Sequence, residues 1–264
     1  TDMVNKEVLT TQEAKDGLNT AIESANKAVS EGLTLEVYNE QVADLNAAIK
    51  AGQEAIDAAT ALEKRNDNHN DKLTSVGEES YDAYVDTDGF AELEKVVLEI
   101  EGKISGEGIF ASMEEIDDYN AKINKAYTKM VSGVIDFSTA SKDAPVDATG
   151  LIITPGFQTR TFNETTQVWE DASSSDGWTA TGGTATSGLN YEIFNDTAGI
   201  HQKLYNMPAG YYRLVYNGFY RAGDITPAAL SRREGVEPLN AQVYLDGNES
   251  KWNKKLVSIF ENLS

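Results

Sequence analysis

Residues 34–64 read TLEVYNEQVADLNAAIKAGQEAIDAATALEK, and this stretch decides the fold class of the first half of the chain. Its apolar residues recur every three or four positions, as in a helix that buries one stripe. They are Leu35, Tyr38, Val42, Leu45, Ile49, Ile56 and Leu62. With roughly eight turns, this predicted helix would be the spine of a helical domain.

Three further helices are predicted by the same spacing. One begins at Thr10, the start of a Thr-x-x-Glu capping pattern, and ends at Gly32. The polar stretch 65–71 predicts a connector. A third helix follows Asp88, which we expect to cap it, and a fourth follows Ser112, the start of a Ser-x-x-Glu pattern. Together the four segments predict an antiparallel, up-and-down bundle.

The composition changes near residue 145. All five prolines and all three tryptophans lie at or after this position: Pro145, Pro155, Pro208, Pro227, Pro238, Trp169, Trp178 and Trp252. Acidic residues outnumber basic ones by 30 to 13 up to Pro145, and by 13 to 9 after it. We therefore predict two domains, an acidic helical bundle over residues 1–144 and a β-rich domain over 145–264.

Alternating short runs of β-branched and aromatic residues follow Pro145. The predicted strands are 151–154, 189–194, 199–205, 211–221 and 241–246. Proline and glycine in the connection 206–210 predict a hairpin between the third and fourth of these. Several short strands of this kind predict an all-β sandwich.

Charge and composition exclude several classes of function. The formal net charge is −21, which repels nucleic acid and anionic lipids. The chain has no cysteine, which excludes disulfides, thiol nucleophiles and Cys-ligated zinc. No apolar run is long enough for a membrane span, and the start at Thr1 without a leader suggests a mature or trimmed form.

The familiar catalytic and cofactor motifs do not occur in the sequence. Gly106-x-Gly108-x-x-Ala111 matches a dinucleotide fingerprint in letters but follows a predicted helix, where that motif does not function. His69 and His201 have no neighbouring residues that would complete a metal site, and we expect them to be surface or hydrogen-bonded histidines. We therefore expect no enzyme, no catalytic or metal-binding residues and no zinc, haem or nucleotide cofactor. A structural calcium ion is left open.

Aromatic residues are the main chemical feature of the second half. Sugars place their C–H faces on aromatic rings while their hydroxyls bind polar side chains. The candidate rings are Trp169, Trp178, Tyr191, Tyr212, Tyr220 and Trp252. Alternation in 211–221 leads us to expect most of these rings in the core.

Several segments resemble a module of surface proteins from gut anaerobic bacteria. They are Asp147–Phe157, Asp176-Gly-Trp178, Tyr191–Phe194, Met207–Leu214 and Gly218-Phe-Tyr-Arg221. That module is similar to galactose-binding-type jelly rolls of the carbohydrate-binding class, and the resemblance covers residues 146 to 260. It also implies closing strands that are not found before Ser264, so the sandwich would be truncated or differently closed. The helical half resembles the FIVAR-like spacers found beside such modules.

The resemblance implies an exported, non-catalytic glycan-binding protein at the bacterial cell surface or in the periplasm. Its partner would be a glycan or cell-surface polysaccharide, and its helical half would act as a spacer. An adhesion or structural protein that binds another protein is one alternative, and an accessory fragment of a glycosidase is a second. Loop position favours Trp169, Trp252 and Arg221 as ligand-binding residues.

Overall fold

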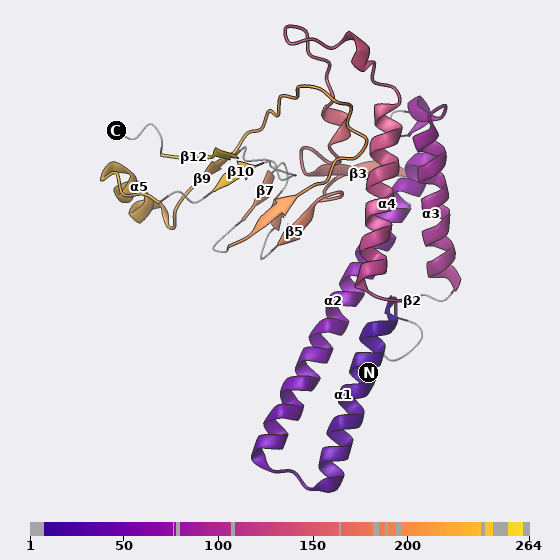
Figure 1. Ribbon diagram of the computed structural model, residues 1–264, viewed down its shortest axis with the longest axis vertical. Helices are drawn as coiled ribbons and strands as arrows, with labels where there is room; N and C mark the ends of the chain where they lie inside the picture. Colours follow the sequence, from indigo (N-terminus) through magenta and orange to yellow (C-terminus); the bar gives the residue numbers. More distant parts are fainter. Residues whose placement is uncertain are drawn as a thin grey trace. The chain divides into compact units, whose positions relative to one another are not determined.

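The computed structural model describes residues 8–75, 77, 80–106, 109–163, 165–181, 185–187, 190–193, 197–238, 241–244 and 253–260. Four long helices occupy the first half of the chain, which confirms the predicted helical region (Figure 1). They are α1 (Gln12–Glu31), α2 (Leu35–Thr74), α3 (Asp88–Gly106) and α4 (Met113–Ser132). No helix in the described ranges combines the length and apolar character needed to cross a membrane.

Hydroxyl side chains cap these helices at their N-termini. Ser112 accepts a hydrogen bond from the Glu115 N–H at 3.4 Å, as its capping pattern predicts. Two predicted caps are wrong by one residue. The first helix is capped by Thr11 and not Thr10. The third is preceded by Thr87, whose hydroxyl accepts from the Phe90 N–H at 3.2 Å, so Asp88 is the first helical residue and not the cap.

Helix α2 is 40 residues long and runs through the polar stretch 65–71, so the predicted connector is wrong. This stretch contains no glycine or proline, and its Asn, Asp and His residues disfavour a helix by only a few tenths of a kcal/mol each. The burial pattern continues through it, because Leu62, Asn66 and His69 are all buried. Tertiary packing therefore extends the helix by about three turns.

The helices form two antiparallel pairs, α1 with α2 and α3 with α4, and α2 is long enough to contact all three other helices (Figure 1). Helix α1 packs along the first half of α2, whereas α3 and α4 pack along its second half. The main core lies in the second region and contains Leu62, Leu93, Ile100, Phe110, Ile116, Ile123 and Met130. A short parallel pair, β1 (Thr10–Thr11) with β2 (Ile109–Phe110), ties the start of α1 to the turn between α3 and α4.

Short antiparallel strand pairs follow the helices within the same compact unit. They are β3 (Gln158–Asn163) with β4 (Val168–Ser173), β5 (Thr179–Thr181) with β8 (Gly199–His201), and β6 (Ala185–Ser187) with β7 (Asn190–Glu192). The β3–β4 hairpin is the longest of them and was not predicted from the sequence. Two short 3₁₀ turns, Phe137–Thr139 and Thr149–Leu151, lead from α4 to this region.

A second compact unit covers residues 209–264. It contains β9 (Phe219–Tyr220) paired in parallel with β12 (Val257–Ser258), and β10 (Gln242–Tyr244) paired antiparallel with β11 (Asn253–Lys255). Helix α5 (Ile225–Arg233) lies between β9 and β10 in the sequence.

Two of the predicted strands are wrong. Residues 151–154 begin at the last residue of a 3₁₀ turn and form no strand, and within 211–221 only Phe219–Tyr220 is a strand. The predicted hairpin across 206–210 does not form, because β8 pairs with β5. Sheets of the described residues contain two strands each, and no jelly-roll sandwich is seen among them.

The first compact unit of the structure ends at Pro208. The change in amino-acid composition had instead predicted a domain boundary between residues 144 and 145. The difference arises because the first part of the β-rich region packs against the helices. Leu151 belongs to the same buried core as α3 and α4, and Lys72 of α2 donates a hydrogen bond to Thr159 of β3 at 3.2 Å. A change in composition therefore does not mark the end of the first compact unit.

Close packing of α3 against α4 depends on Gly89. A Cβ atom at this position would lie 2.0 Å from the backbone nitrogen of Met130, so any side chain would push the helices apart. We predict that Gly89→Ala lowers the free energy of unfolding by about 1–3 kcal/mol, in the range of overpacked cores. Gly102→Ala is the matched control in the same helix, because no atom lies within 4 Å of its added Cβ.

Urea denaturation of both variants would measure this difference. Gly102→Ala should gain about 0.5–1 kcal/mol from helix propensity. Equal effects of the two substitutions would contradict the proposed close contact.

Candidate functional site

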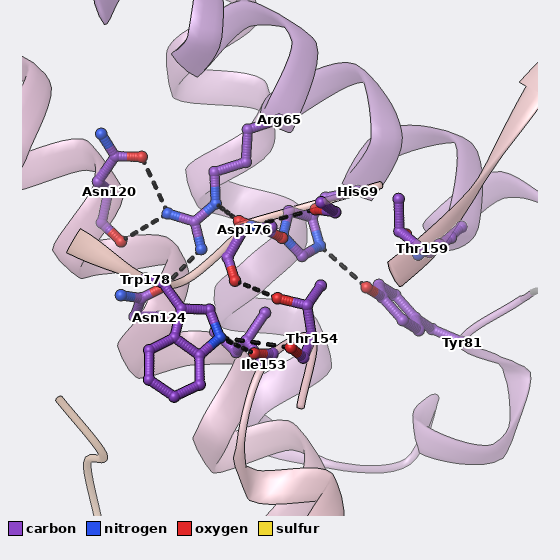
Figure 2. Close-up of polar contacts among 12 residues, drawn as sticks. Arg65, His69, Tyr81, Asn120, Asn124, Ile153, Thr154, Thr159, Asp176 and Trp178 are labelled. Carbon is purple, nitrogen blue, oxygen red and sulfur yellow. Dashed lines mark hydrogen bonds and ion pairs between the residues drawn. The ribbon is translucent and has the colours of Figure 1, made fainter. Parts of the chain in front are cut away.

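A buried ion pair joins helix α2 to the loop before β5. The guanidinium of Arg65 contacts the carboxylate of Asp176 through its Nε atom (Figure 2). The two side chains are only 9% and 13% exposed. The same guanidinium donates from Nη1 to the side chain of Asn120 at 2.9 Å and from Nη2 to Asn124, both on α4. One arginine thus connects α2, α4 and the loop that carries Asp176.

His69 lies one turn after Arg65 and extends this cluster. Its Nε2 is 3.4 Å from Oδ2 of Asp176, and its Nδ1 is 2.9 Å from the hydroxyl of Tyr81 (Figure 2). An ionised carboxylate can only accept hydrogen bonds, so Nε2 carries the proton. Nδ1 therefore accepts from the Tyr81 hydroxyl, and the Nε2 proton faces the carboxylate of Asp176.

Burial and charge both shift the pKa values of the cluster. Burial raises the pKa of Asp176, but Arg65 and the bond from His69 outweigh it and hold that pKa well below its usual range. Burial lowers the pKa of His69, against the opposing effect of Asp176, so the imidazole is neutral. Burial also raises the pKa of Tyr81 well above 10 and that of Tyr127 to about 12, so both phenols stay protonated.

The loop beside Asp176 is fixed by the two residues that follow it. Gly177 has a φ of 79°, and a Cβ there would lie 2.6 Å from the Cβ of Ile153. Trp178 donates from its indole nitrogen to the carbonyl of Ile153 at 3.0 Å (Figure 2). Gln202 binds both backbone groups of Ile153, accepting from its N–H and donating to its carbonyl. The Asp-Gly-Trp segment is therefore held at both ends: Asp176 contacts Arg65 of α2, and Trp178 donates to the backbone of Ile153.

A polar depression of about 330 Å³ lies beside the cluster. Helix α2, Tyr81 and Tyr127 form one side, and the loop 153–155 with β3 and β4 forms the other. Its lining residues are His69, Lys72, Tyr81, Tyr127, Ile153, Thr154, Pro155, Gln158, Thr159, Arg160, Asp171 and Asp176. Hydroxyls, an amide, ammonium and guanidinium groups, and carboxylates line the depression together with two tyrosines.

One face of the β3–β4 hairpin leads away from this depression. Arg160 lies opposite Asp171, with its Nε 3.1 Å from the carboxylate. The next pair on the same face is Phe162 opposite Trp169, whose ring centroids are 5.6 Å apart. A polar pair that lines the depression is thus followed by an aromatic pair.

The predicted ligand-binding residues have different positions. Trp169 was expected in a loop, which is wrong: it is half-buried on strand β4, two residues from Asp171 of the depression. Arg221 is half-buried in the second unit, directly after β9. Trp252 lies outside the described residues. Within the first unit, the structure therefore places Trp169 next to the depression.

The expectation that most candidate rings lie in the core is wrong for the described residues, because none of these rings is fully buried. Trp178 and Tyr191 pack against Phe157, with centroid distances of 5.2 and 5.1 Å. Tyr212, in contrast, is exposed. Residues 211–218 form no strand, so the alternation on which the expectation depended is absent there.

The sequence interpretation missed Arg65 and the role of His69, because the polar stretch was assigned to a connector. A signal was present, since Leu62, Asn66 and His69 continue the spacing of three and four that starts at Ala55. His69 is a buried, hydrogen-bonded histidine and not a surface residue of a loop. Among the described residues, no three His, Asp or Glu side chains lie together as a metal site.

No protein-family model matches this sequence, and neither a curated protein nor a solved structure shows significant similarity to the chain.

Loss of the Asp176 carboxylate would leave the Arg65 guanidinium buried without its counter-ion. We predict that Asp176→Asn lowers the free energy of unfolding by about 3–5 kcal/mol. Asp171→Asn removes a carboxylate that is 83% exposed in its pair with Arg160 and should cost less than about 1 kcal/mol. Denaturant titration at neutral pH measures both, and similar losses would contradict the structural importance of the buried pair.

The lowered pKa of His69 predicts how stability depends on pH. The unfolded chain takes up a proton near pH 6.5, whereas the folded chain does so only at lower pH. Stability should therefore be full above about pH 6.5 and fall below it, by up to about 1.4 kcal/mol per pH unit. His69→Gln should flatten this slope between pH 7 and pH 5, whereas His201→Gln, at an exposed position, should not. Equal slopes in the two variants would contradict a buried neutral His69.

Proposed function

We propose that the chain is a non-catalytic glycan-binding protein that is exported to the bacterial surface or periplasm. The helical bundle would serve as spacer and as one wall of the binding site, and the β3–β4 hairpin as the other wall. The observation that carries the proposal is the depression between α2 and this hairpin, which hydrogen-bonding side chains line together with Tyr81 and Tyr127.

The chemistry of the depression suits a carbohydrate. A sugar ring needs donors and acceptors for its hydroxyls and an apolar surface for its C–H face. Gln158, Thr154 and Arg160 offer the polar groups, and Tyr127 offers part of a ring. About 330 Å³ is at the small end of ligand pockets, enough for one or two sugar rings.

The aromatic pair on the hairpin could extend this site. Trp169 and Phe162 share the face of Arg160 and Asp171, so a chain of sugars that leaves the depression along this face would reach their rings. Trp169 therefore remains the ligand-binding residue that we propose from the sequence. Arg221 is not needed for this site.

The hydrogen-bonding of the cluster supports a non-catalytic role. An Asp–His–Tyr chain resembles a proton relay in composition, but a phenol with a raised pKa is a poor nucleophile at neutral pH. The carboxylate of Asp176 is already engaged by Arg65, which suits an anchor better than a base. The cluster would then position the walls of the site.

The resemblance to galactose-binding-type modules is a second line of support. Asp176-Gly-Trp178 is one of the segments that carry this resemblance. Its tryptophan donates a hydrogen bond to Ile153, which lines the depression. We propose that the β-rich region belongs to this jelly-roll class, with a FIVAR-like helical region before it.

Glycan binding can be tested with the full chain on an array of immobilised oligosaccharides that includes uronate-containing chains. We expect retention of at least one class of glycan, and about tenfold weaker binding of it by Gln158→Ala and by Trp169→Ala. Val168→Ala is the matched control, because Val168 is exposed on the opposite face of β4 from Trp169. Thermal unfolding of each variant separates lost binding from lost folding.

An array without any retained glycan would contradict the proposed function. Retention that both Gln158→Ala and Trp169→Ala leave unchanged would contradict the proposed site.

A further inference from the structure

The outer part of the α1–α2 hairpin exposes a row of large apolar side chains. In α2 the row contains Leu35, Tyr38, Val42 and Ile49, which are 78%, 53%, 38% and 52% exposed. In α1 it contains Ile22 and Val29, which are also exposed. The spacing of three, four and seven residues is that of a coiled-coil seam. Such a row normally packs against another helix.

Both rows lie on the same side of the hairpin. In α1, Ile22 and Val29 each follow by one position a residue of the α2-facing stripe, Ala21 or Ala28. In α2, Val42 and Ile49 each follow by one position a residue of the α1-facing stripe, Gln41 or Ala48. One position is a rotation of about 100° about the helix axis. The same rotation about two antiparallel axes turns both rows toward one side, so they form one continuous face.

This face carries no charge and is bordered by amides. Between Leu18 and Ile56 the apolar positions of the face are flanked by Asn19, Asn26, Asn39, Asn46 and Gln53. These amides also recur every seven residues within each helix. The charged residues of the same stretch lie elsewhere around the helices: Glu23, Lys27, Glu31, Glu36, Glu40, Asp44, Lys50 and Glu54.

We propose that this face binds the same face of a second copy of the chain. Two hairpins would then form a four-helix bundle around a two-fold axis, in which each copy supplies α1 and α2. The proposal does not depend on glycan binding.

The pattern of polar residues favours a second copy as the occupant. An amide both donates and accepts hydrogen bonds, so rows of Asn and Gln complement themselves across a two-fold axis. The formal charge of −21 makes copies of the chain repel one another, and salt screens this repulsion most effectively where the contacting surfaces carry no charges of their own. A cationic partner would instead be matched by acidic residues along the border of the face.

The size of the face is also sufficient. Residues 35–56 of α2 span about 30 Å along the helix, and two adjacent helices are about 20 Å wide. The face therefore covers roughly 600 Å² per copy, or about 1,200 Å² for the pair. This area is at the lower end of the range of specific interfaces and above that of most accidental contacts.

Sedimentation equilibrium of the full chain between about 1 and 100 μM tests the proposal. We expect the mass to rise from 28.7 kDa toward twice that value. Val42→Glu with Ile49→Glu would place like charges across the two-fold axis and should raise the dimer dissociation constant by more than about tenfold. The matched control, Ala43→Glu with Ala47→Glu, adds the same charge at exposed positions outside the face and should change it by less than about twofold.

Circular dichroism of both double variants should show unchanged helix content, because all four positions are exposed. A chain that stays at 28.7 kDa over the whole range would overturn the proposal and leave the face to a different partner protein. A dimer that both double variants weaken equally, or that neither weakens, would overturn the assignment of the interface to this face.

Discussion

The ion pair between Arg65 and Asp176 is the interaction on which the rest of the first unit depends. Removing two charges from water is expensive, and their attraction offsets that cost only when their remaining hydrogen-bonding groups are satisfied. Asn120 and Asn124 satisfy the guanidinium, and His69 approaches the carboxylate. A displaced loop would leave these groups buried without partners, so the pair specifies one position for the loop more than it adds stability.

That position determines the geometry of the candidate site. The Asp176 loop places the indole of Trp178 against the backbone carbonyls of Ile153 and Thr154. Ile153 and Thr154 in turn line the depression, together with His69 and Tyr81. Residues from both sides of the compositional boundary at 145 are therefore required for one site. A β-rich fragment that starts at residue 145 would lack Lys72, Tyr81 and Tyr127.

The extent to which sequence predicted this structure differs between its parts. Helix positions were predictable because the signal is local: from Leu35 to Ile49 apolar residues repeat every three or four positions. The expected burial of this stripe was wrong, since Leu35, Tyr38, Val42 and Ile49 are exposed. The end of α2 was not predictable, because Arg65 and His69 are polar residues at buried positions. Their burial is explained only by Asp176, which lies more than 100 residues later in the sequence. Strand pairing also depends on distant contacts, which is why β3–β4 was missed and the hairpin across 206–210 was wrongly expected. Of the depression, sequence reasoning reached only the neighbouring Trp169.

Helix α2 passes through two different surroundings without a break. Its second half packs against α3, α4 and the buried cluster, and its first half packs against α1 in the part of the chain that the structure describes (Figure 1). Backbone amides in a region with fewer tertiary contacts open to solvent at lower free energy. The helix should therefore behave as two cooperative units, and amide hydrogen exchange would be slow around Asn66 and progressively faster toward Leu35. Over its length of about 60 Å, helix α2 would thus combine a second half that stays closed with a first half that opens to solvent more readily.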